Sequence, residues 1–290
     1  MIPATFDYHA PQSLDEALSL LEQHRGDAKI LAGGQSLIPA MRFRLAVPAI
    51  LVDINQLDDL RYIEEKSDYL AIGAMTREHS LEGSSVVGSA YPLLHDTALV
   101  VADPLVRNQA TIGGNLAHAD PANDHPATML AYGATVVARG PSGERTIGID
   151  DFFTGLFENA MTDEEILTEI RIPAPAAHSG GAYTKLERKV GDYAISAAAV
   201  QLRLDGPSVA EARIGLTNVS PVPMRAKAAE AELVGKVISD AVMEAAGKAA
   251  AAECDPSPDL RGGVDYKRDI TRVMVKRSIV RAVARAKGGK

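Results

Sequence analysis

The chain has 290 residues, a formal net charge of −8 at pH 7 and a single cysteine, Cys254. The acidic balance argues against general nucleic-acid binding, and one cysteine excludes both an internal disulfide and an iron–sulfur cluster held by cysteines of this chain alone. The N-terminus has no secretory pattern and no apolar run reaches the length of a membrane span, so we expect a cytoplasmic protein.

A small β-α-β unit is expected over residues 1–55. Ser13 and Glu16 have the spacing of a capping box, and the apolar residues that follow recur on one helical face. Two short apolar runs that follow this helix predict buried strands. These strands are predicted at residues 28–31 and 50–54.

A second α/β unit is expected over residues 56–176. Its predicted strands are 69–74, 135–138 and 165–172, with a helix at 127–132. The segment 173–181 is rich in Pro, Ala and Gly and is the best candidate for a linker.

Beyond the linker the pattern changes to strands followed by helices, which indicates an α+β part over residues 177–290. The strands are predicted at 182–187, 193–204 and 209–219, and the helices at 226–233, 239–252 and 266–285. The whole chain is therefore predicted to be α+β, with two α/β subdomains followed by an antiparallel sheet with helices.

Two glycine pairs about eighty residues apart carry the strongest functional signal. They lie in Ala32-Gly33-Gly34-Gln35-Ser36 and in Thr111-Ile112-Gly113-Gly114-Asn115. Paired glycines let backbone N–H groups converge and let a ligand touch the main chain. Since neither loop contains Lys or Arg, a pyrophosphate would rest there mainly on amide dipoles. Neither loop has the G-x-G-x-x-G or P-loop spacing, and the alternative is that both are tight turns.

Three other segments invite a functional interpretation. Residues 118–125 contain two His and two Asp, which suggests either a metal site or a polar loop that caps the next helix. Residues 266–290 are basic with helical periodicity, which predicts a docked helix; a helix that contacts another subunit or a membrane surface is the alternative. Cys254 lies between acidic residues that should raise its pKa, so we assign no nucleophile and no catalytic residue.

The glycine loops resemble those of the FAD-binding subunits of the molybdenum hydroxylases, and most closely the medium subunits of the aerobic, molybdenum-containing carbon monoxide dehydrogenases. Two further stretches carry the resemblance: Glu164-Glu165-Ile166-Leu167 before Ile170-Arg171-Ile172-Pro173, and Tyr183-Thr184-Lys185 before Gly191-Asp192-Tyr193-Ala194. The resemblance implies a PCMH-type FAD-binding domain over residues 1–176 and a C-terminal domain of the carbon monoxide dehydrogenase flavoprotein type over residues 177–290.

The same resemblance implies which residues contact FAD. Asp124 would accept hydrogen bonds from ribityl or ribose hydroxyls, Leu167 would be an apolar contact and Lys185 a polar contact near the flavin ring. Tyr193 would lie near the isoalloxazine, and Val101 would form part of a wall that is small in this chain. The complete predicted set is Ala32, Gly33, Gly34, Gln35, Ser36, Leu37, Val101, Thr111, Ile112, Gly113, Gly114, Asn115, Asp124, Leu167, Lys185 and Tyr193.

By resemblance, the chain passes electrons through FAD within a complex. A small [2Fe–2S] subunit and a large molybdopterin subunit would be its partners in a dimer of heterotrimers, with a quinone or similar acceptor, and the complex could lie at the inner face of the cell membrane. One alternative is the flavin subunit of a related hydroxylase that acts on a purine, N-heterocycle or aromatic substrate. Another is an assembly or scaffold protein that keeps the fold without electron transfer.

Overall fold

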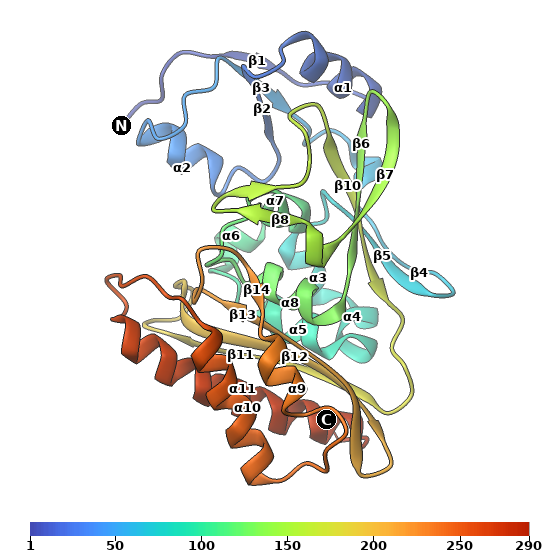
Figure 1. Ribbon diagram of the computed structural model, residues 1–290. Helices are drawn as coiled ribbons and strands as arrows, with labels where there is room; N and C mark the ends of the chain where they lie inside the picture. The colour runs from blue at the N-terminus through green and yellow to red at the C-terminus, as the bar shows by residue number, and fades with distance from the viewer. Residues whose placement is uncertain (290) are drawn as a thin grey trace.

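The computed structural model describes residues 1–289 and builds them around three sheets and one short hairpin (Figure 1). The first sheet is parallel, in the order β1-β3-β2, and contains both strands predicted for this unit. Helix α1 begins after Ser13, whose hydroxyl accepts a hydrogen bond from the Glu16 amide at 3.2 Å. The capping box is only half formed, because the Glu16 carboxylate accepts from the Gln12 amide instead. The elements are β1 (Asp7–His9), α1 (Leu14–Gln23), β2 (Ala28–Leu31), α2 (Leu37–Arg42) and β3 (Ile50–Asp53).

The second sheet has five antiparallel strands in the order β4-β5-β10-β6-β7. The strands predicted at 69–74, 165–172 and 135–138 are confirmed as its three central members. The sheet consists of β4 (Ile63–Glu65), β5 (Tyr69–Gly73), β6 (Thr135–Gly140), β7 (Gly143–Gly148) and β10 (Ile166–Pro173), and the neighbouring hairpin of β8 (Phe153–Gly155) and β9 (Glu158–Asn159).

Short helices fill the chain between β5 and β6, and most of them were not predicted. None is longer than nine residues, which is too short for apolar periodicity to be distinctive. They are α3 (Glu78–Gly83), α4 (Ser85–Ala90), α5 (Pro92–Val100), α6 (Pro104–Arg107), α7 (Ile112–His118) and α8 (Asp124–Tyr132), and single 3₁₀ turns lie at Asp58–Leu60 and Ile149–Asp151.

The third sheet is antiparallel, in the order β11-β12-β13-β14, as the sequence predicted for the C-terminal part. Helices α10 and α11 cover one face, while α5 and α8 lie against the other (Figure 1). Helix α8 is buried along residues 124–131 because protein surrounds it, so the helix carries no polar stripe. The elements are β11 (Ser179–Glu187), β12 (Ala194–Asp205), β13 (Ser208–Thr217), β14 (Met224–Arg225), α9 (Lys227–Ala231), α10 (Asp240–Glu253) and α11 (Val264–Ala286).

The linker is shorter than predicted. Strand β11 already begins at Ser179, so only residues 174–178 connect the second and third sheets. Gly180 and Gly181 belong to the strand, and a Cβ on Gly180 would lie 2.2 Å from the carbonyl oxygen of Ala282 in α11. These glycines therefore allow close packing of helix on strand, where the sequence alone suggested flexibility.

The basic C-terminal segment is a docked helix, as predicted. Arg285 and Arg281 of α11 both reach Asp96 of α5, with N–O distances of 2.7 and 2.8 Å. Lys267 is 2 % exposed and pairs with Asp259 at 2.8 Å. Much of the basic charge is thus used inside the fold. No helix within residues 1–289 is long and apolar enough to cross a membrane.

Candidate cofactor-binding site

The first glycine loop presents unpaired backbone donors. It joins the end of β2 to the start of α2, and Gly34 has φ +71°, a conformation that favours glycine. In the part of the chain that the structure describes, the backbone N–H groups of residues 33–37 donate to no protein acceptor. The Gln35 side chain donates to the carbonyl of Gly33 at 3.2 Å, which stabilises the turn. A run of free amides of this kind suits an anion.

The second glycine loop differs, because its amides are already paired. The N–H groups of Ile112 and Gly113 donate to the carbonyls of Thr76 and Ala74 at 3.1 and 2.9 Å. The Gly114 amide donates to the Thr111 hydroxyl at 3.2 Å, which caps α7. The expectation that both loops offer backbone donors therefore holds only for the first loop. The polar group left over here is a side chain: Asn115 Oδ1 is buried and has no partner among residues 1–289.

The two loops lie in contact. A Cβ on Gly33 would come within 2.4 Å of the Gln109 carbonyl oxygen, just before the second loop. A Cβ on Gly114 would lie 3.5 Å from the Cβ of Ala32, and one on Gly113 would lie 2.5 Å from that of Ala74. Glycine is therefore required at Gly33 and Gly113 by close packing between chain segments.

A buried polar cluster brings Asp124 and Lys185 together. Asp124, at the start of α8, accepts from the Lys185 ammonium at 3.0 Å and from the Tyr183 hydroxyl at 2.6 Å. The Lys185 side chain is 3 % exposed, and Glu187 lies 3.5 Å from its nitrogen. Burial, followed by the charge of Asp124, raises the pKa of Tyr183 well above its usual value, so the phenol remains a donor. Lys185 is thus neutralised by carboxylates and is not a free cation.

The Lys185 ammonium also donates to the carbonyl of Val100 at 3.0 Å, which links the cluster to the end of α5. Val101, predicted as part of a wall, is 6 % exposed and directly follows this carbonyl. Tyr193 is 43 % exposed, and the guanidinium of Arg261 lies 5.4 Å from the centre of its ring. Val101 and Lys185 are therefore held together, while Tyr193 lies on a more open loop.

Leu167 is a core residue of β10 beside the second loop. It is 5 % exposed and belongs to the same apolar cluster as Ile112 and Ala74. The strand is irregular between Leu167 and Glu169, and the Thr168 carbonyl at this point accepts from the Ala74 amide at 2.9 Å. Leu167 is thus buried among apolar neighbours next to the loop.

The structure does not arrange the histidines of residues 118–125 or the Cys254 thiol as a reactive site. His125 pairs with Glu78 at 2.7 Å with neither side chain exposed, and His118 packs on the ring of Phe157 at 5.1 Å between centroids. Within residues 1–289 no three His, Cys, Asp or Glu side chains are placed to hold a metal ion. Burial raises the pKa of Cys254 to about 11, so the direction expected from sequence is right but the acidic neighbour is the smallest cause.

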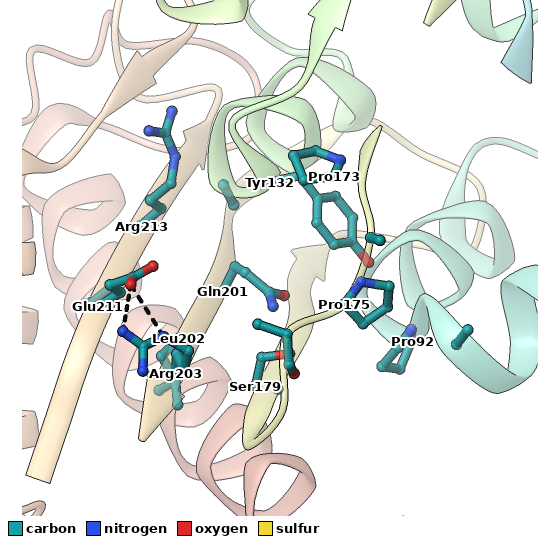
Figure 2. A pocket seen from close by; sticks show the side chains of 17 residues that line it. Pro92, Tyr132, Pro173, Pro175, Ser179, Gln201, Leu202, Arg203, Glu211 and Arg213 are labelled. Carbon is teal, nitrogen blue, oxygen red and sulfur yellow. Dashed lines mark hydrogen bonds and ion pairs between the residues drawn. The ribbon is translucent and has the colours of Figure 1, made fainter. Parts of the chain in front are cut away.

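A separate pocket lies away from these residues (Figure 2). It is bordered by Pro92, by Pro173 and Pro175 of the connection, and by Tyr132. Tyr132 is the last residue of α8, whereas Asp124 is the first, so the pocket lies at the opposite end of that helix. Figure 2 also shows the ion pair between strand residues Arg203 and Glu211 beside the pocket.

Sequence reasoning missed two groups of contacts near the predicted site. Tyr183 shares the buried face of β11 with Lys185 because side chains two apart in a strand point the same way, and that spacing could have found it. Arg77 and Asn55, which connect the two loops, lie in no recognisable motif.

Comparisons with known proteins identify the class. Residues 4–175 match the family described as the FAD binding domain in molybdopterin dehydrogenase, and residues 181–282 match the CO dehydrogenase flavoprotein C-terminal domain. The chain therefore belongs to the family of FAD-binding subunits of molybdopterin dehydrogenases.

Within that family the chain is similar to the carbon monoxide dehydrogenase medium chain of Hydrogenophaga pseudoflava, with 47% identity over 98% of this chain and 99% of that protein. It is 37% identical to the 6-hydroxypseudooxynicotine dehydrogenase complex subunit alpha of Paenarthrobacter nicotinovorans, over 99% of this chain and 97% of that protein. A solved structure of carbon monoxide dehydrogenase from Hydrogenophaga pseudoflava superposes with a TM-score of 0.96 at 49% identity, covering 98% of this chain and 99% of the other. The predicted α+β fold class is confirmed.

Proposed function

We propose that this chain is the FAD-binding electron-transfer subunit of a heteromeric molybdenum hydroxylase of the aerobic carbon monoxide dehydrogenase type. The observation that carries the proposal is the pair of contacting glycine loops, of which the first leaves the amides of residues 33–37 free. Family membership supports FAD as the ligand. The identity of 47% to a carbon monoxide dehydrogenase chain supports the subtype.

The residues fit a dinucleotide. Free amides at 33–37 suit a pyrophosphate, and the orphaned buried Oδ1 of Asn115 is an acceptor that requires a donor such as a ligand hydroxyl or water. Asp124 already accepts from Tyr183 and Lys185, so any hydrogen bond from ribityl or ribose hydroxyls would use its remaining lone pairs. The contacts proposed for Leu167 and Tyr193 remain those implied by the resemblance.

FAD, when bound, supplies the ability to accept electrons from one carrier and pass them to another. The contribution of this chain is to bind and orient it and to set the charge around it. Lys185 lies between the carboxylates of Asp124 and Glu187, so this cluster carries no excess of positive charge. We therefore propose that Lys185 acts on the flavin as a hydrogen-bond donor and not as a free cation.

The partners are proposed from the same relationship. A small [2Fe–2S] subunit would deliver electrons from a large molybdopterin subunit, in a dimer of heterotrimers, and a quinone would be the acceptor. We also propose a cytoplasmic location at the inner face of the membrane. The chain has a single cysteine, which supports a separate subunit for the iron–sulfur clusters, since their ligands are several cysteines.

We keep the proposed division into residues 1–176 and 177–290. It is supported by the connection at 174–178, where β10 ends and β11 has not begun. The main apolar clusters of the second and third sheets are separate, and a smaller cluster joins α5 and α8 to β11 and β12 across the division.

The proposal is tested with the intact complex. Carbon monoxide should bleach the flavin absorbance band of the complex, and should leave that of the isolated chain unchanged. If a purine or an N-heterocycle bleaches the band and carbon monoxide does not, the substrate is wrong and the subunit assignment stands. Purified chain without flavin that still assembles with its partners would instead favour the scaffold alternative.

A further inference from the structure

Arg77 links the two glycine loops through its side chain. It lies just before α3, and its guanidinium donates to the Asn55 Oδ1 at 2.6 Å and also to the carbonyl of Gln109. Asn55 in turn donates from Nδ2 to the carbonyl of Ala32 at 2.7 Å, at the start of the first loop. One chain of hydrogen bonds therefore runs from the first loop to the residues just before the second.

The backbone of Arg77 is fixed to the second loop as well. Arg77 and Thr111 form an antiparallel bridge. On either side of it, the Glu78 amide donates to the carbonyl of Ala110 and the Ile112 amide donates to that of Thr76, both at 3.1 Å. The side chain and main chain of one residue thus hold the first loop, through Asn55, against the second.

Among residues 1–289, no carboxylate contacts the Arg77 guanidinium. Both of its acceptors are neutral amide oxygens, the Asn55 side-chain oxygen and the Gln109 carbonyl. Burial, followed by the charge of Arg61, lowers the pKa of Arg77, while the charge of Asp53, which accepts from Asn55 Nδ2 at 2.6 Å, opposes this. Arg203 of β12 is different, because the carboxylate of Glu211 lies 2.5 Å from its guanidinium. A half-buried cation without a partner carboxylate favours an anion nearby.

We propose that Arg77 is a positioning residue for the pyrophosphate of the dinucleotide. With Asn55 it holds the two glycine loops in register, and its guanidinium supplies the positive charge that both loops lack. The inference rests on the proposed function, because it takes a diphosphate as the ligand. The positive charge that attracts the diphosphate would thus come from a residue outside both glycine motifs.

The test compares FAD binding by variants of the full chain after removal of the flavin. Arg77→Gln removes the charge and most of the fork, Arg77→Lys keeps the charge, and Arg203→Gln, in the third sheet, is the matched control. Charge-assisted hydrogen bonds predict an FAD Kd about 10- to 100-fold higher for Arg77→Gln. Arg77→Lys should recover part of the loss, and Arg203→Gln should stay within about threefold of the wild type. Raising the salt concentration should weaken FAD binding by the wild type more than by Arg77→Gln.

Thermal unfolding of the flavin-free variants separates this role from a structural one. Unchanged FAD affinity in Arg77→Gln, or an equal loss in Arg203→Gln, would overturn the inference while leaving the proposed function intact. The inference would also be overturned if the loss of FAD affinity followed the loss in melting temperature. In that case Arg77→Lys would not recover the affinity, and Arg77→Gln would keep the salt dependence of the wild type. Failure of the wild-type chain to bind FAD would instead overturn the proposed function, and the inference with it.

Discussion

Asp124→Asn tests the buried cluster that joins α8 to β11. The substitution keeps an oxygen for the Tyr183 hydroxyl but removes the charge that faces the Lys185 ammonium at 3.0 Å. The two side chains are 8 and 3 % exposed, so water cannot replace the lost partner. Breaking a buried pair on one side costs about 3–5 kcal/mol, and the Glu187 carboxylate at 3.5 Å from the same nitrogen places this case at the lower end. A loss of about 3 kcal/mol corresponds to a melting temperature roughly 6–12 °C lower.

The control is Asp15→Asn, which makes the same change in an exposed pair. Asp15 lies 2.8 Å from Arg139, with the two side chains 80 and 43 % exposed. Because such pairs contribute about 0–1 kcal/mol, the melting temperature should fall by no more than about 4 °C. The assay is thermal unfolding of the flavin-free chain followed by circular dichroism. Equal shifts in the two variants would refute the argument that burial determines the cost.

Three further outcomes are expected. Gly33→Ala should lose most bound flavin, because its Cβ would lie 2.4 Å from a main-chain oxygen, whereas Gly83→Ala, with nothing within 4 Å, should retain it; flavin absorbance per chain checks both. Cys254, whose pKa burial raises to about 11, should resist iodoacetamide at pH 8 in the native chain and react after denaturation; rapid native labelling would contradict its burial. Burial lowers the pKa of His125, but the facing Glu78 outweighs this and the net shift is upward. Stability from a raised histidine pKa is complete below the unfolded value of about 6.5 and is lost as the pH rises through the folded value. The excess stability of wild type over Glu78→Gln should therefore shrink as the pH rises above about 6.5. Denaturant unfolding at each pH would show a constant difference if the reasoning is wrong.

The regular elements could be predicted because their signals are local. The Ser13 cap, the short apolar runs of the first two sheets and the strand-then-helix order of the C-terminal part each lie within one element. The helices of residues 78–118 could not, because each is too short for its periodicity to stand out. Their positions depend on packing against sheets formed by distant residues.

The candidate site divides in the same way. The glycine pairs were visible in the sequence, but which loop has free amides depends on hydrogen bonds to Ala74 and Thr76, which no local pattern reveals. The ion pair that balances the charge of Lys185 likewise depends on Asp124, which is distant in sequence. Arg77 was invisible because its role comes from two acceptors on separate segments.

The central claim is that the free amides of the first glycine loop hold the pyrophosphate of one FAD. Acid extraction of the chain purified from its native complex, followed by chromatography against FAD and FMN standards, tests it most directly. The account predicts about one FAD per chain. FMN as the native flavin, or no flavin in an active complex, would contradict it, because neither would place a pyrophosphate at the free amides of residues 33–37.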